Sequence, residues 1–95
     1  MNRENPQAIE SFYLTAHAQM QMQRRGIKRS EVAQVLAQPE QILLAREGRW
    51  IYQSRLLHGE PPRLFLLRVV VEVEHEIPWV ITAYLTSRVA KYMET

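Results

Sequence analysis

The pattern of apolar residues changes at Pro39, and this change constrains the fold more than any other feature of the chain. Before it, good helix formers run from Thr15 to Arg25, and an apolar stripe then recurs at helical spacing within residues 30–38. After it, residues 64–74 alternate, with apolar side chains on one side and Arg or Glu interrupting the other. This order predicts an α+β domain in which helices come first and an antiparallel sheet follows.

Capping residues set the expected ends of the helices. Thr15 is a good N-cap for the first helix, and Gly26 after Arg25 matches a left-handed C-terminal stop. Ser30 is expected to cap a second, short helix that Pro39 ends. The two helices are therefore expected to be antiparallel and joined by a tight turn.

Four strands are expected after the second helix, at residues 41–46, 49–56, 64–74 and 79–85. The first two form a hairpin around a glycine turn. The alternation places Val69, Val71 and Ile81 in the core, with Trp79 on the same side as Ile81. The predicted architecture is two N-terminal helices packed on a four-stranded antiparallel sheet.

Length and composition predict one domain over residues 1–95, with residues 1–12 as a polar N-terminal arm. The chain has no Cys, which excludes disulfides and thiolate sites, and its formal net charge of +2 is mild. The N-terminus lacks an apolar signal segment, and no apolar run is long enough to span a membrane. The cytoplasm is therefore the expected location.

The first helix carries candidates for proton transfer and phosphate binding. Histidine is the side chain most often used for proton transfer, which makes His17 a candidate, and Arg25 offers a planar fork to phosphate oxygens. The alternative for both is structural, because a helical His commonly packs and an Arg at a helix end suits the helix dipole. The chain has no Asp and its three His are far apart in sequence, so neither a metal site nor a cofactor is expected.

The expected sheet and tail carry the other candidates, which combine cations with aromatic rings and hydroxyl groups. They are Arg49, Tyr52 and Arg68 on the middle strands, Thr82 and Tyr84 on the last strand, and Lys91 and Tyr92 in the tail. Such a set neutralises phosphates and stacks on bases in proteins that bind RNA. Strand residues of this kind also serve simply to keep a sheet soluble, and that alternative remains open.

The order of short motifs resembles an uncharacterised family of small bacterial proteins that is catalogued as a domain of unknown function. The residues that carry the resemblance are His17-Ala18, Met22, Arg25-Gly26-Ile27, Val32, Pro39, Gly48-Arg49, Tyr52, Val69 to Val71, Thr82, Tyr84, Ser87 and Lys91-Tyr92. That family is similar to the RelE, ParE and BrnT type toxins, whose fold is two helices followed by an antiparallel sheet. The resemblance implies metal-independent cleavage of RNA, in which a 2′-hydroxyl attacks the adjacent phosphate. The family pattern places an Arg four residues after the histidine, where this chain has Gln21.

The resulting hypothesis is a toxin-like protein that binds RNA, with cleavage of the RNA left open. In it, His17, Tyr84 and Lys91 are catalytic, and Arg25, Arg49, Tyr52, Arg68, Thr82 and Tyr92 bind the substrate. RNA is the expected partner and no membrane is expected, while a cognate antitoxin and a homodimer are left open. The alternative is a non-catalytic protein-interaction module or an inactive toxin relative, with Trp50, Trp79 and the methionines supplying its surface.

Overall fold

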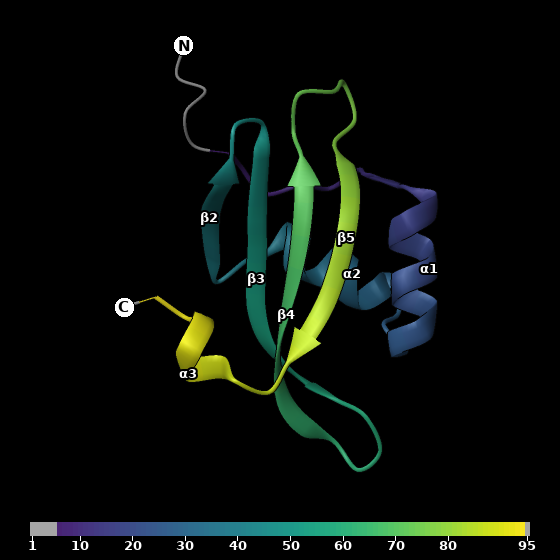
Figure 1. The fold of residues 1–95 in the computed structure, drawn as a ribbon, viewed down its shortest axis with the longest axis vertical. Coiled ribbons are helices and arrows are strands. Elements are labelled where there is room, and N and C mark those ends of the chain that lie inside the picture. Colours follow the sequence, from purple (N-terminus) through teal and green to yellow (C-terminus); the bar gives the residue numbers. More distant parts are fainter. Residues whose placement is uncertain (1–5, 95) are drawn as a thin grey trace.

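A computed structural model of the chain describes residues 6–94 and shows a mixed sheet with helices on both sides (Figure 1). In chain order the elements are β1 (Tyr13–Leu14), α1 (Ala16–Arg25), α2 (Arg29–Ala37), β2 (Gln41–Arg46), β3 (Arg49–His58), β4 (Arg63–Glu72), β5 (Trp79–Thr86) and α3 (Val89–Tyr92). The strand order is β1-β5-β4-β3-β2, with β1 parallel to β5 and the other neighbours antiparallel. Helices α1 and α2 pack on one side of this sheet, and α3 lies on the other.

The predicted four-stranded antiparallel sheet is wrong in both the number and the direction of its strands. Tyr13–Leu14 is a fifth strand that pairs in parallel with Trp79 and Val80. A strand of two residues is too short to show an alternation, so the sequence pattern carried no signal for it. The predicted layer of two helices also omits α3, which covers the opposite side of the sheet.

The described part of the predicted N-terminal arm lies on the body of the domain. Ile9 and Phe12 are buried in the core, and the Ile9 backbone N–H donates to the Leu36 carbonyl at 2.8 Å. Residues 1–5 of that arm lie outside the described residues. The arm therefore contributes two apolar side chains to the core before the first strand begins.

The predicted caps of the first helix are confirmed. The Thr15 hydroxyl oxygen accepts from the Ala18 backbone N–H at 3.1 Å, and Gly26 has a left-handed φ of 67°. The same hydroxyl donates to the Val80 carbonyl at 3.0 Å, so the cap also fastens α1 to β5. The predicted Ser30 cap is wrong, because α2 begins at Arg29, one residue before Ser30.

The core lies between the sheet and helices α1 and α2. Its buried apolar residues are Ile9, Phe12, Ala18, Met22, Ile27, Val32, Val35, Leu36, Tyr52, Leu67, Val69, Val71, Val80 and Ala83. Burial of Val69 and Val71 was predicted, but Ile81 is only half-buried. The cause is a bulge: Val70 pairs with Thr82 and Val71 pairs with Val80, so Ile81 has no opposite residue. The bulge turns Val80 into the core and leaves its neighbour Trp79 on the other side.

Candidate nucleic-acid interface

The side of the sheet opposite α1 and α2 carries most of the predicted binding residues, and we call it the α3 face. The strand register places its residues in three rows: Gln53, Arg68 and Tyr84; Ile51, Val70 and Thr82; and Arg49, Glu72 and Trp79. Successive rows are two residues apart along β3 and β4, so their side chains project to the same side of the sheet, and on β5 the bulge puts Trp79 on that side although it is three residues from Thr82. The first row is polar, the second is mainly apolar and the third is charged.

Arg68 is the centre of the first row and is buried, with 8% of its surface exposed. Its Nε donates to Gln53 Oε1 at 2.7 Å and its Nη1 donates to Tyr84 Oη at 2.6 Å. Among residues 6–94, no carboxylate forms an ion pair with it. A buried cation without an anion is costly, so this arrangement needs a reason beyond stability.

The Arg68 guanidinium has one nitrogen without a partner among the described residues. Its Nη2 forms no hydrogen bond to any residue in the described part of the chain. No fully buried polar side-chain atom of these residues lacks a partner, so Nη2 is not completely enclosed. Its N–H groups can donate to an oxygen of a ligand that reaches them.

The Tyr84 hydroxyl keeps its own proton for another acceptor. Its oxygen accepts from Arg68, and no acceptor for its O–H group occurs among the described residues. Thr82 is its neighbour on the same side of β5 and is half-buried. This part of the face can therefore donate hydrogen bonds to an anion through both Arg68 and Tyr84.

Residues 89–94 form a lid over the first row, which we call the C-terminal cover. The Tyr92 ring lies over Arg68, with 4.5 Å between Cζ and the ring centroid. Gln53 Nε2 donates to the Tyr92 carbonyl at 3.0 Å, and Gln41 Oε1 accepts from the Glu94 backbone N–H at 3.0 Å. The Gln41 side chain also donates to the Glu94 carbonyl. These hydrogen bonds hold the cover in place, and none of the α3 residues is fully buried.

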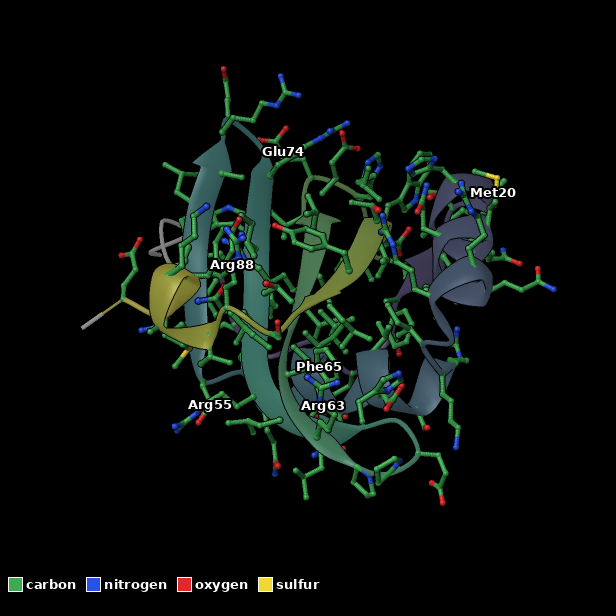
Figure 2. The ribbon with its side chains drawn as sticks, turned by 60° about the horizontal axis from the view of Figure 1, so that its bottom comes forward. Met20, Arg55, Arg63, Phe65, Glu74 and Arg88 are labelled. Carbon is green, nitrogen blue, oxygen red and sulfur yellow. The ribbon has the colours of Figure 1, made fainter. Side chains whose placement is uncertain are left out.

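Further cations flank this row. Lys91 Nζ lies 5.4 Å from the Tyr92 ring centroid, and Arg88 precedes α3. In Figure 2, Arg88 lies beside α3, whereas Met20 lies on α1 at the opposite side of the molecule. Neither Arg88 nor Lys91 has a carboxylate partner within the described residues. The end of the face near α3 therefore carries uncompensated positive charge.

In the third row, unlike the first, the arginine is paired with a carboxylate. Arg49 donates to Glu72 Oε2 through Nε at 2.9 Å and through Nη2 at 2.8 Å, and His75 Nε2 lies 3.1 Å from Glu72 Oε1. Hydrogen bonds from His75 and then Arg49 lower the pKa of Glu72, so this carboxyl stays ionised. The His75 ring stacks on Trp79 with centroids 4.0 Å apart. Arg49 is thus already neutralised by its own partner.

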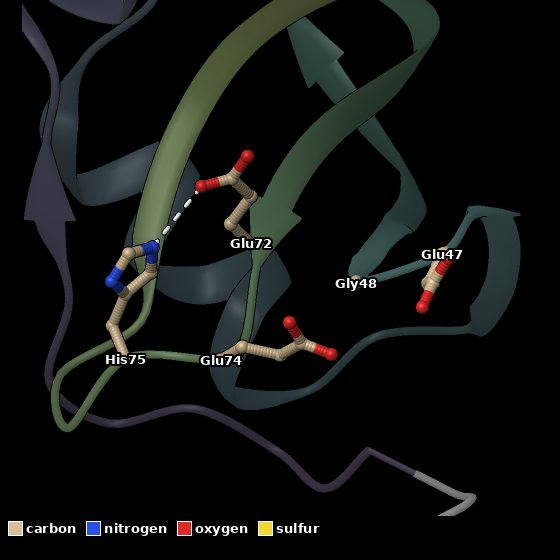
Figure 3. Close-up of a pocket in the computed structure, with 5 residues that line it drawn as sticks. All are labelled: Glu47, Gly48, Glu72, Glu74 and His75. Atoms are coloured by element: carbon tan, nitrogen blue, oxygen red, sulfur yellow. Dashed lines mark hydrogen bonds and ion pairs between the residues drawn. The ribbon is translucent and has the colours of Figure 1, made fainter.

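A hollow of about 210 Å³ lies beside this row (Figure 3). It is lined by Glu47, Gly48, Glu72, Glu74 and His75. Its three carboxylates make it unfavourable for a phosphate. The two ends of the α3 face therefore differ in sign, and an anion is favoured at the end that carries Arg68.

The structure brings five of the nine predicted site residues together around the first row. They are Arg68, Thr82 and Tyr84 on the strands and Lys91 and Tyr92 in the cover. Arg49 lies on the same face, two rows away and paired with Glu72. Arg49, Tyr84 and Lys91 thus lie on the same side of the sheet, although Arg49 is at its far end.

The other three predicted residues lie elsewhere. His17 is exposed on α1, and Arg25 at the end of that helix donates through Nη1 to the Ala83 carbonyl at 3.2 Å. Tyr52 is fully buried on the core side of β3, where burial raises its pKa to about 12. Its hydroxyl donates to the Gln7 carbonyl at 2.6 Å. None of these three side chains projects onto the α3 face.

Gln41, Gln53 and His75 are polar residues of the face that were not predicted. Gln53 is fully buried and joins Arg68 to the cover, and its Nε2 donates to Gln41 Oε1 at 2.7 Å. A glutamine inside an alternating strand was the available signal, since a polar residue between buried neighbours needs polar partners. His75 follows Glu72 by three residues, and this spacing in the sequence was the available signal for their contact. The spacing is also common in turns, so it does not single out a site.

Among the residues that the structure describes, no group of three or more His, Cys, Asp or Glu side chains is placed to hold a metal ion. No helix among residues 6–94 has the length and apolar character needed to cross a membrane.

Comparison with known proteins gives one match. A family model described as "Domain of unknown function (DUF4258)" matches residues 14–85, which is most of the chain. The match includes β2 to β5 almost entirely and therefore the three rows of the α3 face, and it ends before α3. No curated protein and no solved structure matches the chain.

Proposed function

The chain belongs to the DUF4258 family of domains of unknown function, and we propose that it is an RNA-binding protein whose α3 face holds a phosphate of the RNA at Arg68. The observation that carries this proposal is the buried guanidinium that lacks a carboxylate partner and keeps Nη2 open. A guanidinium matches two phosphate oxygens with parallel hydrogen bonds. A bound phosphate supplies the anion that the protein itself does not provide.

The rest of the α3 face suits a single strand of RNA better than a small anion. Tyr84 offers an aromatic ring next to Arg68, and the half-buried row of Ile51, Val70 and Thr82 offers a flat surface beside it. Bases stack on such rings, and nearby cations track the backbone. Arg88 and Lys91 supply those cations at the same end of the face.

The same geometry supports cleavage without a metal ion, as in the toxins that the sequence resembles. The 2′-hydroxyl attacks the adjacent phosphorus, the bond from phosphorus to the 5′-oxygen breaks, and Arg68 stabilises the added charge on the phosphate. Tyr84 donates its proton to the leaving 5′-oxygen, and the proton of the 2′-hydroxyl passes to solvent. His17 lies on α1 on the other side of the sheet, so Tyr84 is the proton carrier that the face offers. We place this activity in the cytoplasm and propose a cognate antitoxin protein as its inhibitor.

Binding of labelled single-stranded RNA in excess chelator tests the proposal. Arg68→Gln is expected to weaken binding by about tenfold or more, since it removes hydrogen bonds from a charged donor to the phosphate. Arg24→Gln is the matched control, because this substitution removes the same charge at an exposed position at the end of α1. Equal affinity of the two variants would contradict the proposal. Circular dichroism shows whether Arg68→Gln remains folded, and Arg68→Lys keeps the charge if it does not.

A second function, binding of a protein partner, is favoured by a separate group of exposed side chains. Tyr13, Ile77 and Trp79 are 54%, 50% and 39% exposed, and the Tyr13 and Trp79 rings lie 5.7 Å apart. Exposed aromatic residues of this kind are enriched at protein interfaces. Loss of a partner in a Trp79→Ser variant with intact RNA affinity would assign the two functions to different ends of the domain.

A further inference from the structure

We infer that the C-terminal cover competes with RNA for Arg68, so that a phosphate must displace the Tyr92 ring and lift residues 89–94 before it can bind. This inference rests on the proposed function and adds a closed state to it. In the closed state described above, the Arg68 guanidinium faces an aromatic ring instead of an anion.

The first step is that Tyr92 covers one face of the Arg68 guanidinium and that Arg68 is only 8% exposed, which leaves a phosphate too little room to pair with two of its nitrogens. The ring centroid is 4.5 Å from Arg68 Cζ, and the ring of Tyr84 lies 5.6 Å away. Both Nε and Nη1 of Arg68 are engaged, so a phosphate that binds two nitrogens must use Nη2 together with Nη1. A ring this close to the guanidinium limits the approach to that edge.

The second step is that the cover is weakly attached. Helix α3 has only four residues and contributes no buried side chain. Its hydrogen bonds run from Gln41 to the backbone of Glu94 and from Gln53 to the carbonyl of Tyr92, and Tyr92 and Met93 are only half-buried. Water can replace hydrogen bonds at an exposed segment at little cost, so the segment can detach without unfolding the sheet.

The third step is that opening favours the ligand. A cation held against a ring is stabilised less than a cation held by a phosphate in a bidentate pair. The open state therefore has the higher affinity for RNA, and the apparent affinity falls in proportion to the fraction of closed molecules. Any change that weakens the closed state must strengthen RNA binding until the open state predominates.

Two variants of the full chain test this inference in opposite directions. Gln41→Ala removes the contacts to Glu94 and the hydrogen bond from Gln53, while Gln53 keeps its bonds to Arg68 and to the Tyr92 carbonyl, and the variant is expected to raise the affinity for labelled RNA by about threefold to tenfold. Gln34→Ala, an exposed glutamine on α2, is the matched control and is expected to leave the affinity unchanged. Unchanged or weaker binding by Gln41→Ala would overturn the inference, because it would mean that the closed cover helps to hold RNA.

The second test fixes the C-terminal cover in its closed position by a cross-link. The chain has no cysteine, so only the introduced pair in a Gln41→Cys and Glu94→Cys double variant reacts with a cleavable thiol cross-linker. The linked protein is expected to bind RNA at least about tenfold more weakly than the same protein after the linker is cut. Glu94→Cys alone, reacted with the same reagent, controls for the adduct. Equal affinity before and after cutting would overturn the inference.

Inorganic pyrophosphate separates failure of this inference from failure of the proposed function. If the wild-type chain binds no RNA, the proposed function fails, and the same comparisons are repeated with pyrophosphate. Tighter pyrophosphate binding by Gln41→Ala and weaker binding by the linked protein would sustain a covered phosphate site without RNA. No response of pyrophosphate binding to either variant would overturn the inference as well.

Discussion

Replacing Tyr84 with Phe separates the chemical role of its hydroxyl from the structural role of its ring. The change removes one hydrogen bond, donated by Arg68 Nη1 at 2.6 Å. A hydrogen bond from a charged donor contributes about 1.5 to 3 kcal/mol. Arg68 keeps its hydrogen bond to Gln53, and a water molecule can accept from Nη1 in place of the lost hydroxyl. The expected loss of unfolding free energy is therefore about 1 kcal/mol.

A loss of this size lowers the melting temperature of a domain of this length by about 4 to 8 °C. The variant therefore stays folded at 25 °C, and its RNA affinity is expected to fall less than that of Arg68→Gln, because the ring and the Arg68 cation remain although one donor to the phosphate is lost. Cleavage is expected to fall by about 100-fold, the lower end for loss of one proton-transfer group.

Thermal unfolding by circular dichroism and cleavage of labelled RNA in excess chelator measure the two effects on one sample. Tyr13→Phe is the matched control, because its hydroxyl is exposed at the sheet edge, and it should change neither quantity. Wild-type cleavage by folded Tyr84→Phe would refute the assignment of the proton donor. A fall in melting temperature far beyond this range would show instead that the hydroxyl is a structural group.

Three further predictions concern other parts of the domain. Arg49→Ala should change RNA affinity by less than about twofold, because a carboxylate already neutralises this cation; a loss comparable to that of the Arg68 variant would contradict the difference in charge between the two ends. Hydrogen bonds from Arg55 hold the pKa of Glu40 at about 2, below its ordinary value of 4.5. This pair therefore stabilises the fold above pH 4.5, and its contribution is lost as the pH falls toward 2. In urea unfolding, the stability of Arg55→Met should depend less on pH in this range than that of the wild type. Val80→Ala should destabilise the domain by about 2 kcal/mol and Ile81→Ala by less, and the reverse order in urea unfolding would contradict the bulge in β5.

Signals confined to neighbouring residues predicted much of the fold. Thr15 and Gly26 set the ends of α1 through contacts within one turn, and the glycine turn at Gly48 sets the β2–β3 hairpin. Features that depend on distant contacts were missed. The strand β1 exists only because Tyr13 and Leu14 meet β5, and the bulge opposite Val70 depends on how β4 and β5 meet. No local pattern encodes either of them.

The candidate site shows the same division. Alternation along strands correctly grouped Arg68 and Tyr84 on one side, because they pair directly across β4 and β5. The same rule puts Arg49 and Tyr52 on opposite sides of the sheet, because two residues that are three positions apart on one strand project in opposite directions. Burial of Gln53 and coverage of Arg68 by Tyr92 required the position of α3, which follows from contacts with the sheet and from no motif in the tail.

Mapping the RNA contact by amide NMR tests the central claim most directly. Labelled wild-type protein is titrated with a short single-stranded RNA, and the amide and arginine Nε signals that shift are assigned. We predict the largest shifts at Gln53, Arg68 and Tyr84 and in the C-terminal cover, with little change in α1 or around the acidic hollow at Glu74. Shifts concentrated in α1, or the absence of any shift at Arg68, would contradict the account.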